Sequence, residues 1–108
     1  MVRHAAEIEE ITKKVLRLVN ARFLIKAAYL FGSYADGSPR DDSDIDIAIF
    51  ADGVAGLALD DKMAFISDIQ RQVSNDVELH LFPSETLAEL RPSNFPGYIA
   101  AHGKPLAA

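Results

Sequence analysis

Residues 32–46, GSYADGSPRDDSDID, join an apolar segment of the chain to a segment in which apolar and other residues alternate. The pair Gly32 and Ser33 follows the apolar run IKAAYLF at residues 25–31, which predicts a buried strand that meets a turn. Glycine, proline and capping residues in the middle predict a loop, with one helical turn starting at Ser33. The aspartates lead into DIDIAIF at residues 44–50, where every second residue is isoleucine, so a second strand is expected.

The segments on either side of this stretch complete a simple pattern. Residues 4–22 and 59–74 repeat apolar side chains at helical spacing, and DVELHLF at residues 76–82 alternates like a strand. Short helical segments are expected from Ser84 and from Asn94. This order predicts an α/β (α+β) fold, in which a small mixed sheet has helices packed on one side.

The composition is that of an ordinary globular protein, with 49% hydrophobic and 25% charged residues. We expect residues 1–108 to form a single domain around one core. The net charge of −5 and the scattered basic residues argue against direct binding of nucleic acid, and the absence of cysteine excludes disulfides. No segment resembles a signal peptide or a membrane span, so a cytoplasmic protein is expected.

Acidic side chains concentrate around the second predicted strand. Asp41, Asp42, Asp44 and Asp46 place four carboxylates within six residues. The last two project from one face of a strand, about 7 Å apart. Such runs are usually solvated, and we accept that interpretation for Asp41 and Asp42. A third strand acid, Glu78, would complete an oxygen-rich site for Mg²⁺ or Mn²⁺ if the two strands pair.

The glycine turn offers a second feature of a nucleotide site. Gly32 has no Cβ, so phosphate oxygens can approach its backbone, and a helix that starts at Ser33 would present free N–H groups. A Gly-Ser pair after a strand is by itself more often a simple turn. The prediction therefore depends on the acids that follow it.

Together these residues resemble a known signature. Gly32-Ser33, ten intervening residues, the Asp44-x-Asp46 pair and a later strand acid are similar to the nucleotidyltransferase motif of the DNA polymerase beta superfamily. More narrowly, the chain resembles the minimal nucleotidyltransferases, which in many prokaryotes act as antitoxins beside HEPN-domain toxins. The resemblance covers nearly the whole chain, from the first helix to the closing AAHGKPL.

The resemblance implies a role for each motif residue. Gly32 and Ser33 would contact the triphosphate of an ATP substrate. Asp44 and Asp46 would each bind metal, and Glu78 would complete a site for two Mg²⁺ ions. Those ions would activate the acceptor hydroxyl and screen the phosphates during displacement at the α-phosphorus.

Several details are specific to this chain. The family often carries a basic residue where Asp36 stands, so one positive contact to the phosphates is either missing here or supplied by Arg40. The third acid is commonly aspartate, and Glu78 could serve as metal ligand, as general base or as both. His80 shares the predicted face of Glu78, where it could bind substrate, tune the carboxylate or simply lie on the surface.

The implied function is transfer of AMP from ATP to a hydroxyl of a partner protein, most simply a tyrosine of a HEPN toxin. The chain looks too small to carry its own acceptor-recognition domain, so a hetero-oligomer with the toxin is expected. Two alternatives stay open. One is a non-catalytic antitoxin that acts by binding, and the other is transfer to a small molecule such as an aminoglycoside.

Overall fold

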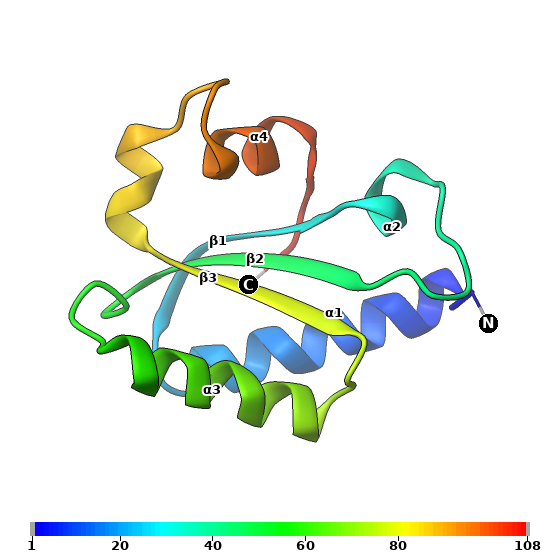
Figure 1. Cartoon of the computed structure of the whole chain (residues 1–108), viewed down its shortest axis with the longest axis horizontal. Coiled ribbons are helices and arrows are strands. Elements are labelled where there is room, and N and C mark those ends of the chain that lie inside the picture. The colour runs from blue at the N-terminus through cyan, green and yellow to red at the C-terminus, as the bar shows by residue number, and fades with distance from the viewer. Residues whose placement is uncertain (1, 108) are drawn as a thin grey trace.

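The computed structural model describes residues 2–107, which form four strands and five helical segments. In chain order these are α1 (Ala5–Asn20), β1 (Leu24–Phe31), α2 (Ser33–Asp36), β2 (Ile45–Asp52), α3 (Leu59–Gln72), β3 (Val77–Pro83), the 3₁₀ helix η1 (Ser84–Glu89), α4 (Phe95–His102) and β4 (Lys104–Pro105). The sheet order is β3-β2-β1-β4 (Figure 1). Strands β2 and β3 run parallel, whereas β1 is antiparallel to both β2 and β4. The predicted mixed sheet is confirmed.

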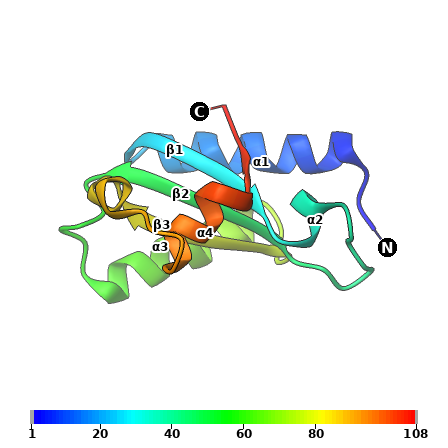
Figure 2. The ribbon, with the colours of Figure 1, turned by 90° about the horizontal axis from the view of Figure 1, so that it is seen from above.

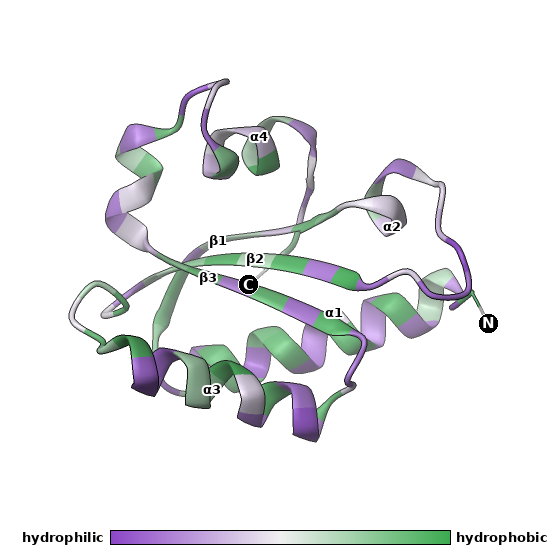
Figure 3. Ribbon diagram, viewed as in Figure 1, coloured by the Kyte–Doolittle hydropathy of each residue, from purple (hydrophilic) through white to green (hydrophobic). Residues whose placement is uncertain are grey.

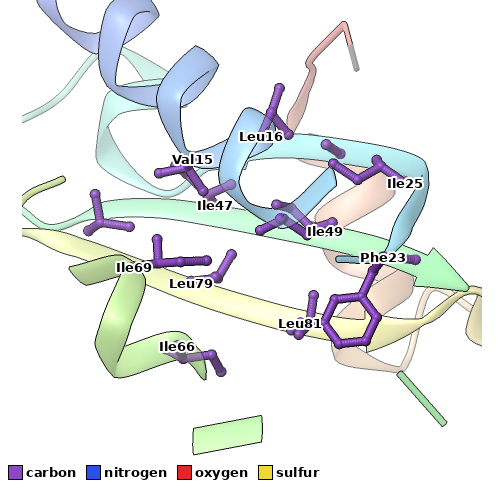
Figure 4. Close-up of a cluster of buried hydrophobic side chains, with 14 of the residues drawn as sticks. Val15, Leu16, Phe23, Ile25, Ile47, Ile49, Ile66, Ile69, Leu79 and Leu81 are labelled. Atoms are coloured by element: carbon purple, nitrogen blue, oxygen red, sulfur yellow. The ribbon is translucent and has the colours of Figure 1, made fainter. Parts of the chain in front are cut away.

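The two long helices cover one face of this sheet. Both α1 and α3 lie below the strands in Figure 1, and their apolar stripes meet the isoleucines of β2 and the leucines of β3. Figure 4 shows Val15 and Ile69 pointing from these helices toward Ile47 and Leu79. The alternation along each strand therefore gives one face a continuous apolar layer.

The opposite face is covered over part of its length by η1 and α4. Figure 2 shows both segments lying over the strands when the molecule is seen from above. Here a smaller cluster forms around Phe50, Ala48, Phe31 and Ile99, all buried. The sequence predicted one core with helices on one side. The long helices follow that expectation, but the short C-terminal segments lie on the other face, and the sheet separates two apolar clusters.

Strand boundaries differ slightly from the sequence prediction. Strand β2 begins at Ile45, so Asp44 lies just before it, and the helical segment that starts at Ser84 is a 3₁₀ helix. The two-residue strand β4 was not predicted, because so short a segment carries no periodic signal. Within residues 2–107, no helix combines the length and apolarity needed to cross a bilayer.

Candidate functional site

The predicted acids meet where β1 ends and β2 and β3 begin. The sheet register pairs Asp46 with Phe31 of β1 on one side and with Glu78 of β3 on the other. Because Asp46 and Glu78 are direct partners in the parallel ladder, their side chains leave the same face of the sheet. Hydrophilic bands cross both strands at this end of the sheet in Figure 3.

Asp46 and Glu78 are close enough to share a proton. Partial burial, a hydrogen bond with Glu78 and the charges of Glu78 and Asp44, in that order of size, together raise the pKa of Asp46 to about 7. Two carboxylates in contact cannot both ionise easily without a counterion. A divalent cation between them would supply that positive charge.

His80 extends the acidic pair along β3. Its Nε2 atom lies 3.7 Å from Oε1 of Glu78, and its ring packs against the rings of Phe31 and Phe95. Burial lowers the pKa of His80, the charge of Glu78 raises it and the nearby Lys62 lowers it, with a net downward shift. The imidazole is therefore neutral at pH 7 and keeps a lone pair available to a metal ion.

The glycine turn contacts the same acids. Gly32 has φ of 75° and ψ of −156°, a conformation that is essentially restricted to glycine. A Cβ at this position would collide with Oδ2 of Asp46 and would lie 3.2 Å from its Cγ. Helix α2 starts immediately afterwards at Ser33, and the first amides of a helix have no partner within it. Donors for an anion are therefore placed directly beside the carboxylates.

Arg40 and Asp44 lie farther out, in the loop that connects α2 to β2, and Asp36 is the last residue of α2. Asp44 is exposed, but its charge contributes to the raised pKa of Asp46. Asp36 accepts hydrogen bonds from the backbone N–H and the hydroxyl of Ser38, so it stabilises the turn after α2. Arg40 is exposed, and its backbone N–H donates to the Ser43 hydroxyl. The phosphate contact expected of Arg40 and metal binding by Asp44 stay predictions.

The donor atoms fit a divalent metal ion. Ligand atoms of Asp46, Glu78 and His80 all lie within 4.8 Å of one another. Two carboxylates and one neutral imidazole form a common donor set for divalent ions. The missing Cβ of Gly32 leaves room for the Asp46 carboxylate to lie against the turn.

A cavity of about 390 Å³ adjoins these residues along the free edge of β3. Glu78 and His80 line it from the strand, Lys62 and Met63 from α3, and Phe95 from the start of α4. Met63 and Phe95 are about half exposed, with 52% and 48% of their surface accessible. This arrangement gives a second molecule a partly apolar approach to the acidic pair.

The sequence left His80 open as either a site residue or plain surface, and it did not identify Lys62 or Phe95. His80 carried a signal, because it lies two residues after Glu78 on the same strand face. Lys62 and Phe95 carried none, since each joins the site only through the packing of α3 and α4 against β3.

Parts of this chain are similar in sequence to known proteins. Residues 13–91 match the family described as polymerase beta nucleotidyltransferase. A Methanocaldococcus jannaschii protein named as a protein adenylyltransferase, MJ1379, is 41% identical over 44 residues, which are 41% of this chain and 44% of that relative. The match therefore spans less than half of the relative's length.

Solved structures share the fold over most of the chain. A toxin-antitoxin structure with AMP-PNP contains a chain that is 26% identical, with a TM-score of 0.62 over 89% of this chain and 72% of that one. A Sulfolobus solfataricus protein described as a nucleotidyltransferase is 21% identical, with a TM-score of 0.60 over 84% of this chain and 86% of its own. A mutant of the toxin-antitoxin pair MntA-HpeT contains a chain that is 23% identical, with a TM-score of 0.55 over 93% of this chain and 73% of that one.

These last two similarities, at low identity, concern the fold alone. The sequence match is independent of them and takes in β1, the glycine turn, β2 and β3, the elements that carry Gly32, Asp46 and Glu78. The chain belongs to the polymerase beta nucleotidyltransferase family.

Proposed function

We propose that this protein transfers AMP from ATP to a hydroxyl group of a partner protein, a tyrosine of a HEPN toxin, and acts as the antitoxin of that toxin. The observation that carries the proposal is the direct pairing of Asp46 with Glu78 beside Gly32. Two carboxyl groups in contact next to a glycine turn contribute little to the stability of the fold. The pair becomes useful once a cation and a triphosphate occupy the site.

ATP would bind with its phosphates at the glycine turn. Gly32 permits close approach to the backbone, Ser33 opens α2, and Arg40 in the following loop would contact the phosphates. Asp44, Asp46 and Glu78 would hold two Mg²⁺ ions. When bound, the ions supply positive charge that lowers the pKa of the acceptor hydroxyl and stabilises the phosphates.

The chain's own groups would then direct the displacement. The acceptor oxygen forms a bond to the α-phosphorus while the bond from that phosphorus to the pyrophosphate oxygen breaks. A carboxylate oxygen of Glu78 accepts the hydroxyl proton, so the products are the AMP-modified acceptor and pyrophosphate. Asp46, at the centre of the register between β1 and β3, keeps the reacting groups aligned.

The acceptor would reach Glu78 through the cavity along β3. This cavity and the acidic pair share Glu78 and His80, and the rim residues Met63 and Phe95 expose apolar surface suited to an aromatic side chain. A tyrosine entering here would bring its hydroxyl to the carboxylates while its ring contacts Phe95. Because ATP is an intracellular metabolite, the reaction would take place in the cytoplasm.

Two similarities support a protein acceptor. The M. jannaschii relative is named for protein adenylyltransferase activity, and a structural neighbour at 26% identity comes from a toxin-antitoxin complex solved with AMP-PNP. Neither of these names refers to a small-molecule acceptor.

The direct test is incubation with α-labelled ATP, Mg²⁺ and the co-expressed protein encoded beside this one. We expect label on a tyrosine of the partner, and its loss in Asp44→Asn and Asp46→Asn. Asp60→Asn, an exposed acid at the start of α3, is the control that should retain transfer. Neutralisation of the partner without label on any acceptor would instead identify a non-catalytic antitoxin.

A further inference from the structure

We propose that Asp46, Glu78 and His80 form one mixed oxygen and nitrogen site that binds a first-row transition-metal ion, such as Mn²⁺ or Co²⁺, in preference to Mg²⁺. The inference rests on the metal site of the proposed function, because two of the residues are shared. It adds a nitrogen ligand and a choice of metal. Neither requires that nucleotidyl transfer occurs.

The distances suit a single ion with little rearrangement. Two ligand atoms that each lie about 2.1 Å from an ion are at most about 4.2 Å apart. Nε2 of His80 is already 3.7 Å from Oε1 of Glu78, and atoms from all three residues fall within 4.8 Å of one another. Small side-chain rotations therefore bring all three onto one cation.

The imidazole is held in place before any ion binds. Its ring centroid lies 5.2 Å from that of Phe31 and 5.5 Å from that of Phe95. These rings come from β1 and from the start of α4, so they restrict His80 from two directions. The backbones that carry the two carboxylates are also fixed, because Asp46 and Glu78 are paired in the sheet. A ligand set on rigid strands loses little freedom when a metal binds.

The nitrogen atom determines which ion is favoured. Mg²⁺ prefers oxygen ligands in near-ideal octahedral geometry, whereas imidazole is a good ligand for first-row transition metals. A site with oxygen atoms only would show a weaker preference of this kind. The inclusion of His80 therefore predicts that Mn²⁺ and Co²⁺ bind more tightly than Mg²⁺.

The test compares metal affinity in the full chain, by calorimetry, for Mn²⁺, Co²⁺ and Mg²⁺. In the variant His80→Phe, a third ring keeps the packing between Phe31 and Phe95 but offers no lone pair. We expect Mn²⁺ and Co²⁺ affinity to fall about 10- to 100-fold, with Mg²⁺ affinity changed less than about 2-fold. The matched control is His102→Phe, which replaces an exposed histidine whose ring contacts that of Tyr98 and should change neither affinity.

A second measurement uses the unaltered protein and does not depend on the folding of a variant. The chain has three histidines, His4, His80 and His102, so an imidazole nitrogen bound to Mn²⁺ must come from one of them. We expect nitrogen hyperfine coupling in the pulsed paramagnetic resonance spectrum of bound Mn²⁺, retained in His102→Phe. Absence of that coupling in the unaltered protein, or an unchanged ratio of Mn²⁺ to Mg²⁺ affinity in folded His80→Phe, would overturn the inference.

These outcomes separate this inference from the proposed function. Tight, His80-dependent binding of Co²⁺ without any AMP transfer would leave the nitrogen ligand established and remove the enzymatic role. If AMP transfer proceeds with Mg²⁺ and metal affinity does not depend on His80, the proposed function stands and the nitrogen ligand is refuted.

Discussion

Strands β2 and β3 present very different surfaces at the two ends of the same sheet face. At the end where both strands begin, Asp46 and Glu78 lie side by side, with Asp46 half-buried and Glu78 exposed. At the other end Phe50 is paired with Phe82, their rings stack with centroids 5.0 Å apart, and Phe50 is fully buried. We call these the acidic end and the aromatic end.

The difference comes from what covers each end. Segments η1 and α4 lie over the aromatic end and remove its side chains from water, whereas the acidic end is bordered by the Gly32 turn and the cavity along β3 (Figures 1 and 2). Burial at the aromatic end stabilises the fold. The acidic end carries like charges, which oppose folding until a cation arrives.

The largest expected effect comes from removing the charge at the acidic end. Asp46→Asn should lower transfer at least about 1000-fold, roughly 4 kcal/mol of transition-state stabilisation, because the central carboxylate of the metal site is lost. The unfolding free energy should stay the same or rise. Steady-state assays and denaturant titration check both parts. If Asp46→Asn retained full transfer, Asp46 would not be part of the active site.

A substitution at the aromatic end should lower the stability of the fold and leave the metal site unchanged. Phe50→Ala is expected to lower the unfolding free energy by about 3 to 5 kcal/mol, because it leaves a cavity against Tyr29 and Phe82. The folded fraction should keep its metal affinity. Urea denaturation measures the loss. The comparison variant is Phe95→Ala, whose ring is 48% exposed and whose removal should cost clearly less.

The glycine turn can be tested against a second glycine with positive φ. Gly32→Ala should cost about 2 kcal/mol and reduce transfer on the order of 100-fold, since its Cβ would displace the carboxylate of Asp46. Gly37 has φ of 84°, but a Cβ there would meet nothing within 4 Å. Gly37→Ala should therefore show only backbone strain, about 1 kcal/mol, with transfer preserved. Equal loss of transfer in both variants would show that the contact with Asp46 has no special role.

The smallest effect concerns pH. Asp46 has its pKa raised from 3.8 to about 7, so between these values the folded state binds more protons than the unfolded state. The unfolding free energy of the metal-free protein should consequently fall as pH rises from about 4 to 8, by about 1 kcal/mol after solvent screening. Thermal denaturation across this range is the measurement. Asp46→Asn, or saturation with a divalent ion, should abolish this component, and a slope of the same size in the variant would contradict it.

Much of the architecture could be read from local patterns. Alternation in residues 44–50 and 76–82 and helical spacing in residues 4–22 and 59–74 predicted the main elements, because periodic burial leaves a periodic sequence. The approximate position of the site followed from Gly32-Ser33 and the strand acids. The C-terminal segments were harder, since η1 and β4 are too short to carry a period.

The composition of the site was only partly predictable. Asp46 and Glu78 were expected together and are paired in the sheet, whereas Asp44 lies outside β2 and is exposed. His80 was weighed as either a site residue or surface. Its place beside Glu78 depends on the rings of Phe31 and Phe95, which come from β1 and α4 and which no local pattern relates to residue 80.

The order of the amino acids established the alternation along the strands, the positions of the turns and the residue types that could hold a metal. Each of these features depends only on residues that are near neighbours in the chain. The register that sets Asp46 against Glu78, the coverage that buries Phe50 and leaves the acids accessible, and the perturbed pKa of Asp46 arose from long-range packing. Such contacts join residues far apart in the chain, and their energies depend on burial and distance in three dimensions.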